Sequence, residues 1–236
     1  MKVAVYFGSI HIYKDMIPAY KSLLVNSDVD KIYLLTEDDK FPYELHRDVE
    51  NINIARKIET WFERDGANWN SAWKYVGLIR CALSKVFPDL DTILSIDCDT
   101  IVKEDVSDLW NINLNNFYVA GVMEPHMTFS THSLYVNAGV TMWNLKKIRE
   151  DGIDDKMIDD LNRNRRMFVC QDTLNAFCRD RIFQLPAMYN VSDFTEQSKR
   201  VKIFHYAGGR PKDWRKLPIV EYYRNLPLDE IRPESA

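Results

Sequence analysis

The sequence predicts a single-domain α/β protein with a Rossmann-like, mostly parallel, twisted sheet that is flanked by helices. Short apolar runs alternate with longer stretches of helical periodicity in the first hundred residues, and this order favours parallel strands joined by crossover helices. The 236 residues are enough for one sizeable core. Because no linker, low-complexity tract or internal repeat divides the chain, we expect one domain.

The expected elements follow in chain order. Residues 2–8, 31–38 and 52–58 are the first three strands, and residues 16–26 form a helix between the first two. A second helix over residues 71–87 begins behind an Asn70 or Ser71 cap. Its apolar positions recur every three or four residues, at Ala72, Val76, Ile79, Leu83 and Val86. Residues 91–99 form the next strand.

Composition narrows the possible function. Hydrophobic residues make up 46% and charged residues 28%, as in ordinary globular proteins, and the net charge of -4 argues against a nucleic-acid binder. No apolar run approaches the roughly 20 residues that span a bilayer, and "MKVAVYFG" is too short for a signal peptide. The four cysteines form no CxxC pair, so we expect reduced thiols and a soluble, cytoplasmic protein.

Asp97 and Asp99 lie within "LSIDCDTIV", residues 94–102, directly after the apolar run that ends at Ile96. Strand side chains two positions apart share a face, so these two carboxylates repel each other unless a cation lies between them. An acidic turn that merely ends a buried strand is the alternative. Ligands of parallel sheets gather at the carboxyl ends of the strands, which favours a cation here.

Two later segments carry polar residues that a core would not need. Asn137, Ala138 and Gly139 interrupt the apolar run at residues 135–145, which indicates either a close approach to the backbone or a β-bulge. "CQDTLNAF" at residues 170–177 predicts the first turn of an amphipathic helix, with Gln171 and Asp172 beside its positive end.

The most basic local stretch, residues 199–216, contains a short strand that ends at His205, followed by Gly208 and Gly209. Glycines among basic side chains suit a phosphate. One imidazole and two carboxylates make a workable site for a divalent cation, with diphosphate oxygens in the remaining positions. This set of ligands favours Mn²⁺ or Mg²⁺ over structural zinc.

In their order along the chain, these segments resemble the retaining glycosyltransferases of family 8, relatives of glycogenin and of bacterial lipopolysaccharide galactosyl- and glucosyltransferases. The resemblance covers most of the chain and rests on "YKSLLVNS", "LSIDCDTIV" with "DVSDLW", "YVNAGVTMWNLKK", "CQDTLNAF" and "HYAGGRPKDW". It implies a GT-A fold over residues 1–226 and a C-terminal tail over residues 227–236.

The resemblance also implies roles for individual residues. Asp97, Asp99 and His205 would bind Mn²⁺ or Mg²⁺. For the chemical step, Gln171 and Asp172 are the expected catalytic residues, either as positioning and electrostatic groups in a front-face attack or as candidates for the nucleophile of a double displacement. The donor would be a nucleotide sugar such as UDP-glucose or UDP-galactose. The residues that contact it would be Gly8, Tyr13, Arg80, Asn137, Ala138, Gly139, Gly208 and Lys212. Of these, Tyr13 would stack on uracil or else simply pack against the first helix.

The chain departs from the family pattern at two places. Cys170 stands where the family commonly has aspartate, so the resemblance does not identify the sugar. An extra residue precedes Lys212 and Asp213 replaces a proline, which leaves both Arg210 and Lys212 as candidates for the diphosphate.

We therefore expect a metal-dependent retaining transferase that moves a hexose to an acceptor hydroxyl on a glycan, a lipid-linked sugar or a protein. Residues 124–135 are expected to form an acceptor loop or an ordinary connection. A phosphohydrolase of the haloacid dehalogenase type is one alternative, although Ile101 stands where that class carries threonine. The other alternative is a nucleotide-sugar-binding protein without turnover.

Overall fold

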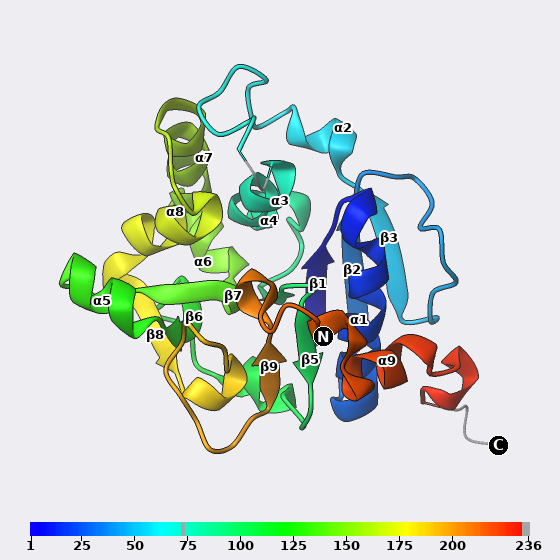
Figure 1. Cartoon of the computed structure of the whole chain (residues 1–236). Coiled ribbons are helices and arrows are strands. Elements are labelled where there is room, and N and C mark those ends of the chain that lie inside the picture. Colours follow the sequence, from blue (N-terminus) through cyan, green and yellow to red (C-terminus); the bar gives the residue numbers. More distant parts are fainter. Residues whose placement is uncertain (72–73, 233–236) are drawn as a thin grey trace.

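A seven-stranded sheet runs through the centre of the computed structural model, which describes residues 1–71 and 74–232 (Figure 1). The order of the strands across the sheet is β3-β2-β1-β4-β7-β6-β8. Their bounds are β1 Val3–Phe7, β2 Lys31–Thr36, β3 Val49–Asn53, β4 Thr92–Ile96, β6 Val119–Met123, β7 Val136–Asn144 and β8 Ile182–Leu185.

The sheet is mostly parallel, as predicted. Strand β1 pairs in parallel with β2 and β4, β2 with β3, and β6 with β8. Strand β7 is antiparallel to both β4 and β6, so within the described residues it alone runs against the other strands of this sheet. A two-stranded antiparallel sheet, β5 (Thr100–Val102) with β9 (Ile203–His205), lies beside it.

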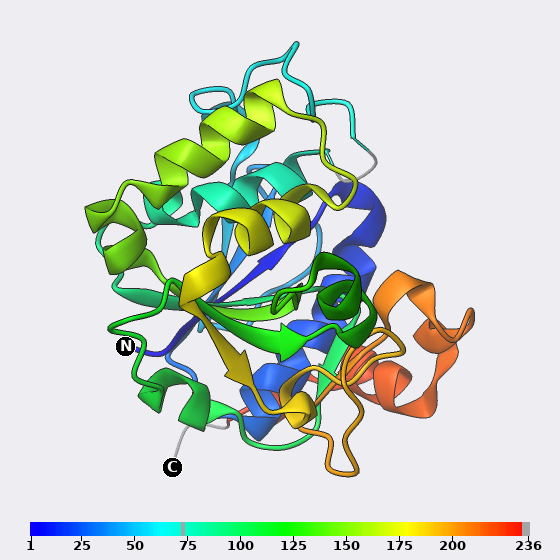
Figure 2. The ribbon, with the colours of Figure 1, turned by 90° about the vertical axis from the view of Figure 1, so that its left-hand side faces the viewer.

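Helices cover both faces of the sheet (Figure 2). Residues of β1 alternate between two apolar cores: Tyr6 packs with α1 (Tyr13–Asn26) and α9 (Pro218–Asn225), whereas Val5 packs on the other side. That other core contains α4 (Leu83–Val86), α6 (Leu145–Glu150), α7 (Ile153–Arg163) and α8 (Val169–Phe177). Burial of both faces explains the uninterrupted apolar runs of the parallel strands.

The third predicted strand is displaced along the chain. Strand β3 begins at Val49 and ends at Asn53, and the remainder of the predicted run forms the short helix α2 (Ala55–Ile58). The side-chain oxygen of Asn53 accepts a hydrogen bond from the backbone N–H of Ala55 at 2.9 Å. This local bond favours a turn over further strand, which explains the early end of β3.

The helix predicted over residues 71–87 is interrupted. It consists of α3 (Lys74–Ile79), a 3₁₀ turn over Arg80–Ala82, and α4. Ile79, Leu83 and Val86 are buried as predicted, whereas Ala72 and the side chain of Val76 lie outside the described residues. A 3₁₀ turn inside a helix often marks a functional position.

Strand β7 pairs irregularly with β6, because Gly121 pairs with Thr141 and Met123 with Val136. Two steps along β6 thus correspond to five along β7, so the irregularity that the sequence indicated as a β-bulge lies in β7, in the stretch that contains Asn137, Ala138 and Gly139. One expectation for this part of the chain needs correction. The expected loop after β6 contains a helix, α5 (Pro125–Thr131), which begins with proline and ends at His132 in the left-handed conformation. Proline in the first turn is compatible with a helix because its missing N–H would have no partner there.

Residues 227–232 pack against α1. Ile231 is buried, and Arg232 donates hydrogen bonds to the carbonyl oxygens of Leu24 at 2.9 Å and Val29 at 2.6 Å. Residues 233–236 lie outside the described part of the chain. None of the helices in the described residues combines the length and apolar character needed to cross a membrane.

Candidate active site

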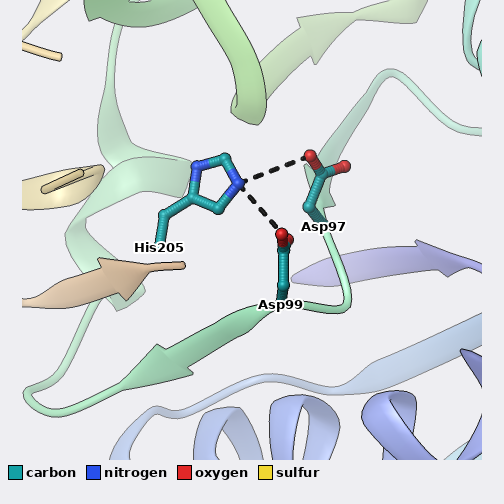
Figure 3. A group of neighbouring side chains, drawn as sticks. All are labelled: Asp97, Asp99 and His205. Atoms are coloured by element: carbon teal, nitrogen blue, oxygen red, sulfur yellow. Dashed lines mark ion pairs between the residues drawn. The ribbon is translucent and has the colours of Figure 1, made fainter. Parts of the chain in front are cut away.

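Asp97, Asp99 and His205 meet where β4 ends (Figure 3). Asp97 follows β4 directly, and Asp99 precedes β5, whose first residue Thr100 pairs with His205 of β9. The Nε2 atom of His205 lies 3.3 Å from Oδ1 of Asp99 and 3.6 Å from Oδ2 of Asp97. The pairing of β5 with β9 thus brings together residues that are far apart in the sequence.

The three side chains fit a hard divalent cation. One ligand atom from each of them can be chosen so that all lie within 4.8 Å of one another. In a six-coordinate Mg²⁺ site with bonds of about 2.1 Å, neighbouring ligands lie about 3 Å apart and opposite ligands about 4 Å apart. The cluster therefore has suitable spacing and leaves positions for other oxygen ligands.

The charges of neighbouring groups shift the pKa values of His205 and Asp97. Burial alone would lower the pKa of His205, but the carboxylates of Asp99 and Asp97 outweigh burial and raise it. Burial would raise the pKa of Asp97, but Arg80 and His205 hold it below its usual value. A proton on Nε2 of His205 thus lies between the two carboxylates, where a cation would also lie.

Arg80 contacts this cluster through Asp97 and is almost fully buried. Its guanidinium forms an ion pair with Asp97, donates to the carbonyl oxygen of Ala138 at 2.8 Å, and lies 4.8 Å from the ring centroid of Phe7. Its Nε has no hydrogen-bond partner among the described residues. Arg80 therefore anchors a proposed metal ligand and still has one donor available.

The small residues of β7 allow a close approach, as the sequence predicted. A Cβ atom at Gly139 would fall 2.1 Å from Cε1 of the His205 ring. The carbonyl oxygen of Gly139 accepts from the backbone N–H of Asp97 at 2.8 Å. The groups that approach the backbone here are side chains of the protein itself, His205 and Arg80.

Gln171 reaches this strand from the first turn of α8. Its Oε1 accepts from the backbone N–H of Ala138 at 2.9 Å. The neighbouring Asp172 accepts from the Tyr135 hydroxyl at 2.6 Å and from the backbone N–H of Phe168 at 2.8 Å. Both carboxylate oxygens of Asp172 are thus engaged in local hydrogen bonds.

The sequence analysis missed two site residues, Glu124 and Asn190. The Oε2 of Glu124 accepts from Gln171, and Oδ1 of Asn190 lies 2.9 Å from Nδ1 of His205. Glu124 directly follows β6, and its place at the end of a strand was a usable signal. Asn190 lies outside the strands, so no periodicity marked it.

The structure does not bring Tyr13 to the site as a stacking platform. Its side chain is 1% exposed, its ring centroid lies 5.1 Å from that of Phe41, and its hydroxyl donates to Asp38 at 2.8 Å. Packing in the core, the alternative for this residue, is what the structure has. Gly8 follows β1, and a Cβ there would lie 2.4 Å from the sulfur of Met16.

The turn after β9 depends on glycine, because Gly208 and Gly209 have φ of 66° and 70°. Such left-handed conformations are costly for other residues. Beyond them, the Arg210 guanidinium lies 5.4 Å from the Phe194 ring centroid. Arg210 and His205 line one cleft of about 450 Å³. Lys212 is exposed and forms no ion pair within the described residues.

The order of the strands and the small second sheet are those of the GT-A fold. Residues 40–217 match the model of "Glycosyl transferase family 8", and the chain belongs to this family. The predicted family, fold and enzyme class are confirmed. The phosphohydrolase and the binding protein without turnover are therefore set aside.

The relatives agree with this assignment. A "Putative glycosyltransferase" of Haemophilus influenzae is 24% identical over 89% of this chain and 72% of its own length. The "Lipopolysaccharide 1,2-glucosyltransferase" of Escherichia coli is 28% identical over 62% of this chain and 53% of its own length.

Solved structures show the same fold. The glycosyltransferase GlyE of Streptococcus pneumoniae has a TM-score of 0.70 and 20% identity over 98% of this chain. This chain spans 62% of that one and 46% of the WbbM bifunctional enzyme. The galactosyltransferase LgtC, solved with donor and acceptor sugar analogues, has a TM-score of 0.66 and 17% identity over 87% of both chains.

Proposed function

We propose that this glycosyltransferase transfers a hexose from a UDP-sugar, UDP-glucose or UDP-galactose, with the help of Mn²⁺ or Mg²⁺. The observation that carries the proposal is the cluster of Asp97, Asp99 and His205 at the end of β4. The names of two relatives, a glucosyltransferase and a galactosyltransferase, support a hexose. The acceptor would offer a hydroxyl on a glycan, a lipid-linked sugar or a protein.

The main requirement of this reaction is to stabilise the negative charge that develops on the leaving diphosphate. Asp97, Asp99 and His205 would hold the cation, which when bound would neutralise that charge. Arg80 keeps Asp97 ionised and in place. Arg210 is favoured over Lys212 as the basic residue for the diphosphate, because Arg210 lines a cleft together with His205.

The donor sugar would lie over Asn137, Ala138 and Gly139, next to Gln171. We propose retention by front-face attack, in which the leaving phosphate accepts the proton of the acceptor hydroxyl. A double displacement would need a protein nucleophile. Both oxygens of Asp172 accept hydrogen bonds, and the amide of Gln171 is a poor nucleophile, which supports positioning roles for both residues.

A screen of nucleotide sugars for Mn²⁺-dependent hydrolysis tests the proposal without knowledge of the acceptor. Release of UDP from one UDP-hexose is the expected result, and EDTA should abolish it. Proton NMR of the first sugar released, read before mutarotation, should show the anomeric configuration of the donor. An inverted sugar would exclude the front-face mechanism.

The compartment is also part of the proposal. All four cysteines lie in the described part of the chain and are free and buried. Buried, reduced thiols are typical of proteins in reducing compartments. We propose that the reaction takes place in the cytoplasm.

A further inference from the structure

Glu124 is a buried carboxylate that forms no ion pair with any basic side chain of the described residues. It is 8% exposed and follows β6 directly. Its Oε2 accepts two side-chain amides, Nδ2 of Asn137 at 3.1 Å and Nε2 of Gln171 at 3.1 Å. Because a buried carboxylate is costly unless it is hydrogen-bonded, these two amides are its support.

The orientation of the Asn137 amide follows from a backbone donor. Its Oδ1 accepts from the N–H of Gly139 at 2.9 Å, and a backbone N–H can only donate. Nδ2 of Asn137 therefore faces Glu124, where the carboxylate can only accept. The Asn137 amide therefore has one fixed orientation, with Oδ1 as the acceptor and Nδ2 as the donor.

The orientation of the Asn137 amide in turn fixes that of the Asn190 amide, and Asn190 is fully buried. Because Oδ1 of Asn137 only accepts, Nδ2 of Asn190 must donate to it, at 3.0 Å. Oδ1 of Asn190 then faces Nδ1 of His205 at 2.9 Å. Since this oxygen also only accepts, the hydrogen lies on Nδ1 of His205.

The lone pair of the neutral ring is consequently on Nε2. This is the nitrogen that lies 3.3 Å from Asp99 and 3.6 Å from Asp97. Partners on the far nitrogen of a metal-binding histidine fix its tautomer and increase its basicity.

We infer that Asn190 is the positioning residue of His205, and that Glu124 ends the hydrogen-bond chain that holds Asn190 and Asn137 in orientation. The chain, from His205 through Asn190 and Asn137 to Glu124, presents Nε2 to a divalent cation. Glu124 also fixes the amide of Gln171, whose Oε1 is turned to Ala138. The inference deepens the proposed function and rests on its divalent cation.

Two pairs of variants test the chain through Mn²⁺ affinity in the presence of UDP, measured from the EPR signal of free Mn²⁺. Asn190→Leu removes the acceptor for Nδ1, whereas Asn190→Asp keeps an oxygen there. Glu124→Leu removes the acceptor for both amides, whereas Glu124→Gln keeps one oxygen that accepts both. Glu221→Leu, at an exposed position on α9, is the matched control.

We expect each leucine variant at the chain to weaken Mn²⁺ binding by about tenfold or more, as partners of metal ligands commonly do. Asn190→Asp and Glu124→Gln should bind Mn²⁺ more tightly than their leucine counterparts, and Glu221→Leu should match wild type. Wild-type affinity in folded Asn190→Leu and Glu124→Leu proteins would overturn the inference.

The wild-type protein provides a test that does not depend on the folding of any variant. Nitrogen-15 NMR of the histidine rings, with Mg²⁺ and UDP bound, should show hydrogen on Nδ1 of His205 and none on Nε2. The His205→Gln variant identifies the signals. Hydrogen on Nε2 would overturn the chain.

The same spectrum separates this inference from the proposed function. At alkaline pH without metal, where the ring is neutral, hydrogen should again lie on Nδ1. If wild type binds neither Mn²⁺ nor Mg²⁺ but has this tautomer, the metal-dependent function fails and the hydrogen-bond chain stands. If metal binds and the tautomer is reversed, the chain fails and the function stands.

Discussion

The ring of His205 lies so close to Gly139 that a Cβ at position 139 would fall 2.1 Å from ring atom Cε1. Strand β7 must carry glycine at this position for β9 to present its imidazole to Asp97 and Asp99. Strands β7 and β9 are thus in close contact at Gly139 and His205. The proposed metal cluster depends on this contact, because it sets the position of the imidazole ring.

Gly139→Ala should displace His205 and weaken Mn²⁺ binding strongly, with a loss of stability of about 1–3 kcal/mol from overpacking. Gly121→Ala in the neighbouring strand is the control, because its Cβ would lie 3.0 Å from Val136, away from the cluster. Calorimetric titration with Mn²⁺ and thermal unfolding measure the two effects. Equal metal affinity in Gly139→Ala and Gly121→Ala would contradict the role of Gly139.

Asp99→Asn should abolish most Mn²⁺-dependent turnover and leave the thermal unfolding temperature nearly unchanged, because the carboxylate is partly exposed. In this variant, the affinity for UDP should no longer depend on Mn²⁺, as calorimetry with and without EDTA would show. Asp213→Asn, at an exposed position, provides the comparison. Full turnover in Asp99→Asn would exclude this carboxylate as a metal ligand.

Gln171→Ala should slow transfer without abolishing it, by about 10- to 100-fold, which corresponds to roughly 1.4–2.8 kcal/mol. Its Oε1 accepts a hydrogen bond from the backbone N–H of Ala138, and the proposed front-face mechanism gives it a positioning role with no covalent bond to the sugar. Asp172→Asn should likewise retain measurable turnover. Complete loss in either variant, with normal binding of the donor, would instead indicate a nucleophile.

Arg210→Ala should weaken UDP binding more than Lys212→Ala, because Arg210 lines the cleft that reaches His205. Both side chains are exposed, so neither change should affect stability appreciably. Calorimetry with UDP and Mn²⁺ gives the two affinities. A larger loss in Lys212→Ala would assign the diphosphate to the lysine.

Asp160 should make the protein sensitive to acid. Burial would raise its pKa, but Arg166 and Asn164 outweigh burial and lower it. A lowered pKa stabilises the fold above the unfolded value of about 3.9, and this stabilisation is lost as the pH falls through the native pKa.

Asp160→Asn should cost about 1.5–3 kcal/mol at neutral pH, since the Arg166 guanidinium loses a charged partner. The difference from wild type should shrink as the pH falls below about 4 in thermal unfolding. Asp159→Asn, an exposed neighbour, controls for charge. A difference that is constant with pH would contradict the role of the ion pair.

The sequence allowed prediction of the features that depend on neighbouring residues. Asp97 and Asp99 follow a strand with a clear apolar pattern, and His205 is the last residue of another strand. Their positions at the ends of strands could therefore be inferred. The parallel order followed from alternating periodicities. In these cases local preference and tertiary structure agree.

Features that depend on contacts between distant segments could not be predicted. The Tyr13 ring is buried in the core. Its position after the first strand had instead suggested a residue exposed at the donor site. Asn190 gains its role only because β9 returns next to it, where the N–H of His205 donates to the carbonyl of Val191 at 2.9 Å. Glu124 belongs to the segment expected to be an acceptor loop or an ordinary connection, and its role depends on Asn137 and Gln171, which come later in the chain.

The pairing of β5 with β9 has a kinetic consequence. Thr100 and His205 are far apart along the chain, and contacts of this kind form late because closing a long loop is entropically costly. During synthesis, Asp97 and Asp99 emerge well before their imidazole partner. The nascent enzyme should therefore be unable to hold the proposed divalent cation until most of the domain has left the ribosome, which would couple the onset of activity to the completion of folding.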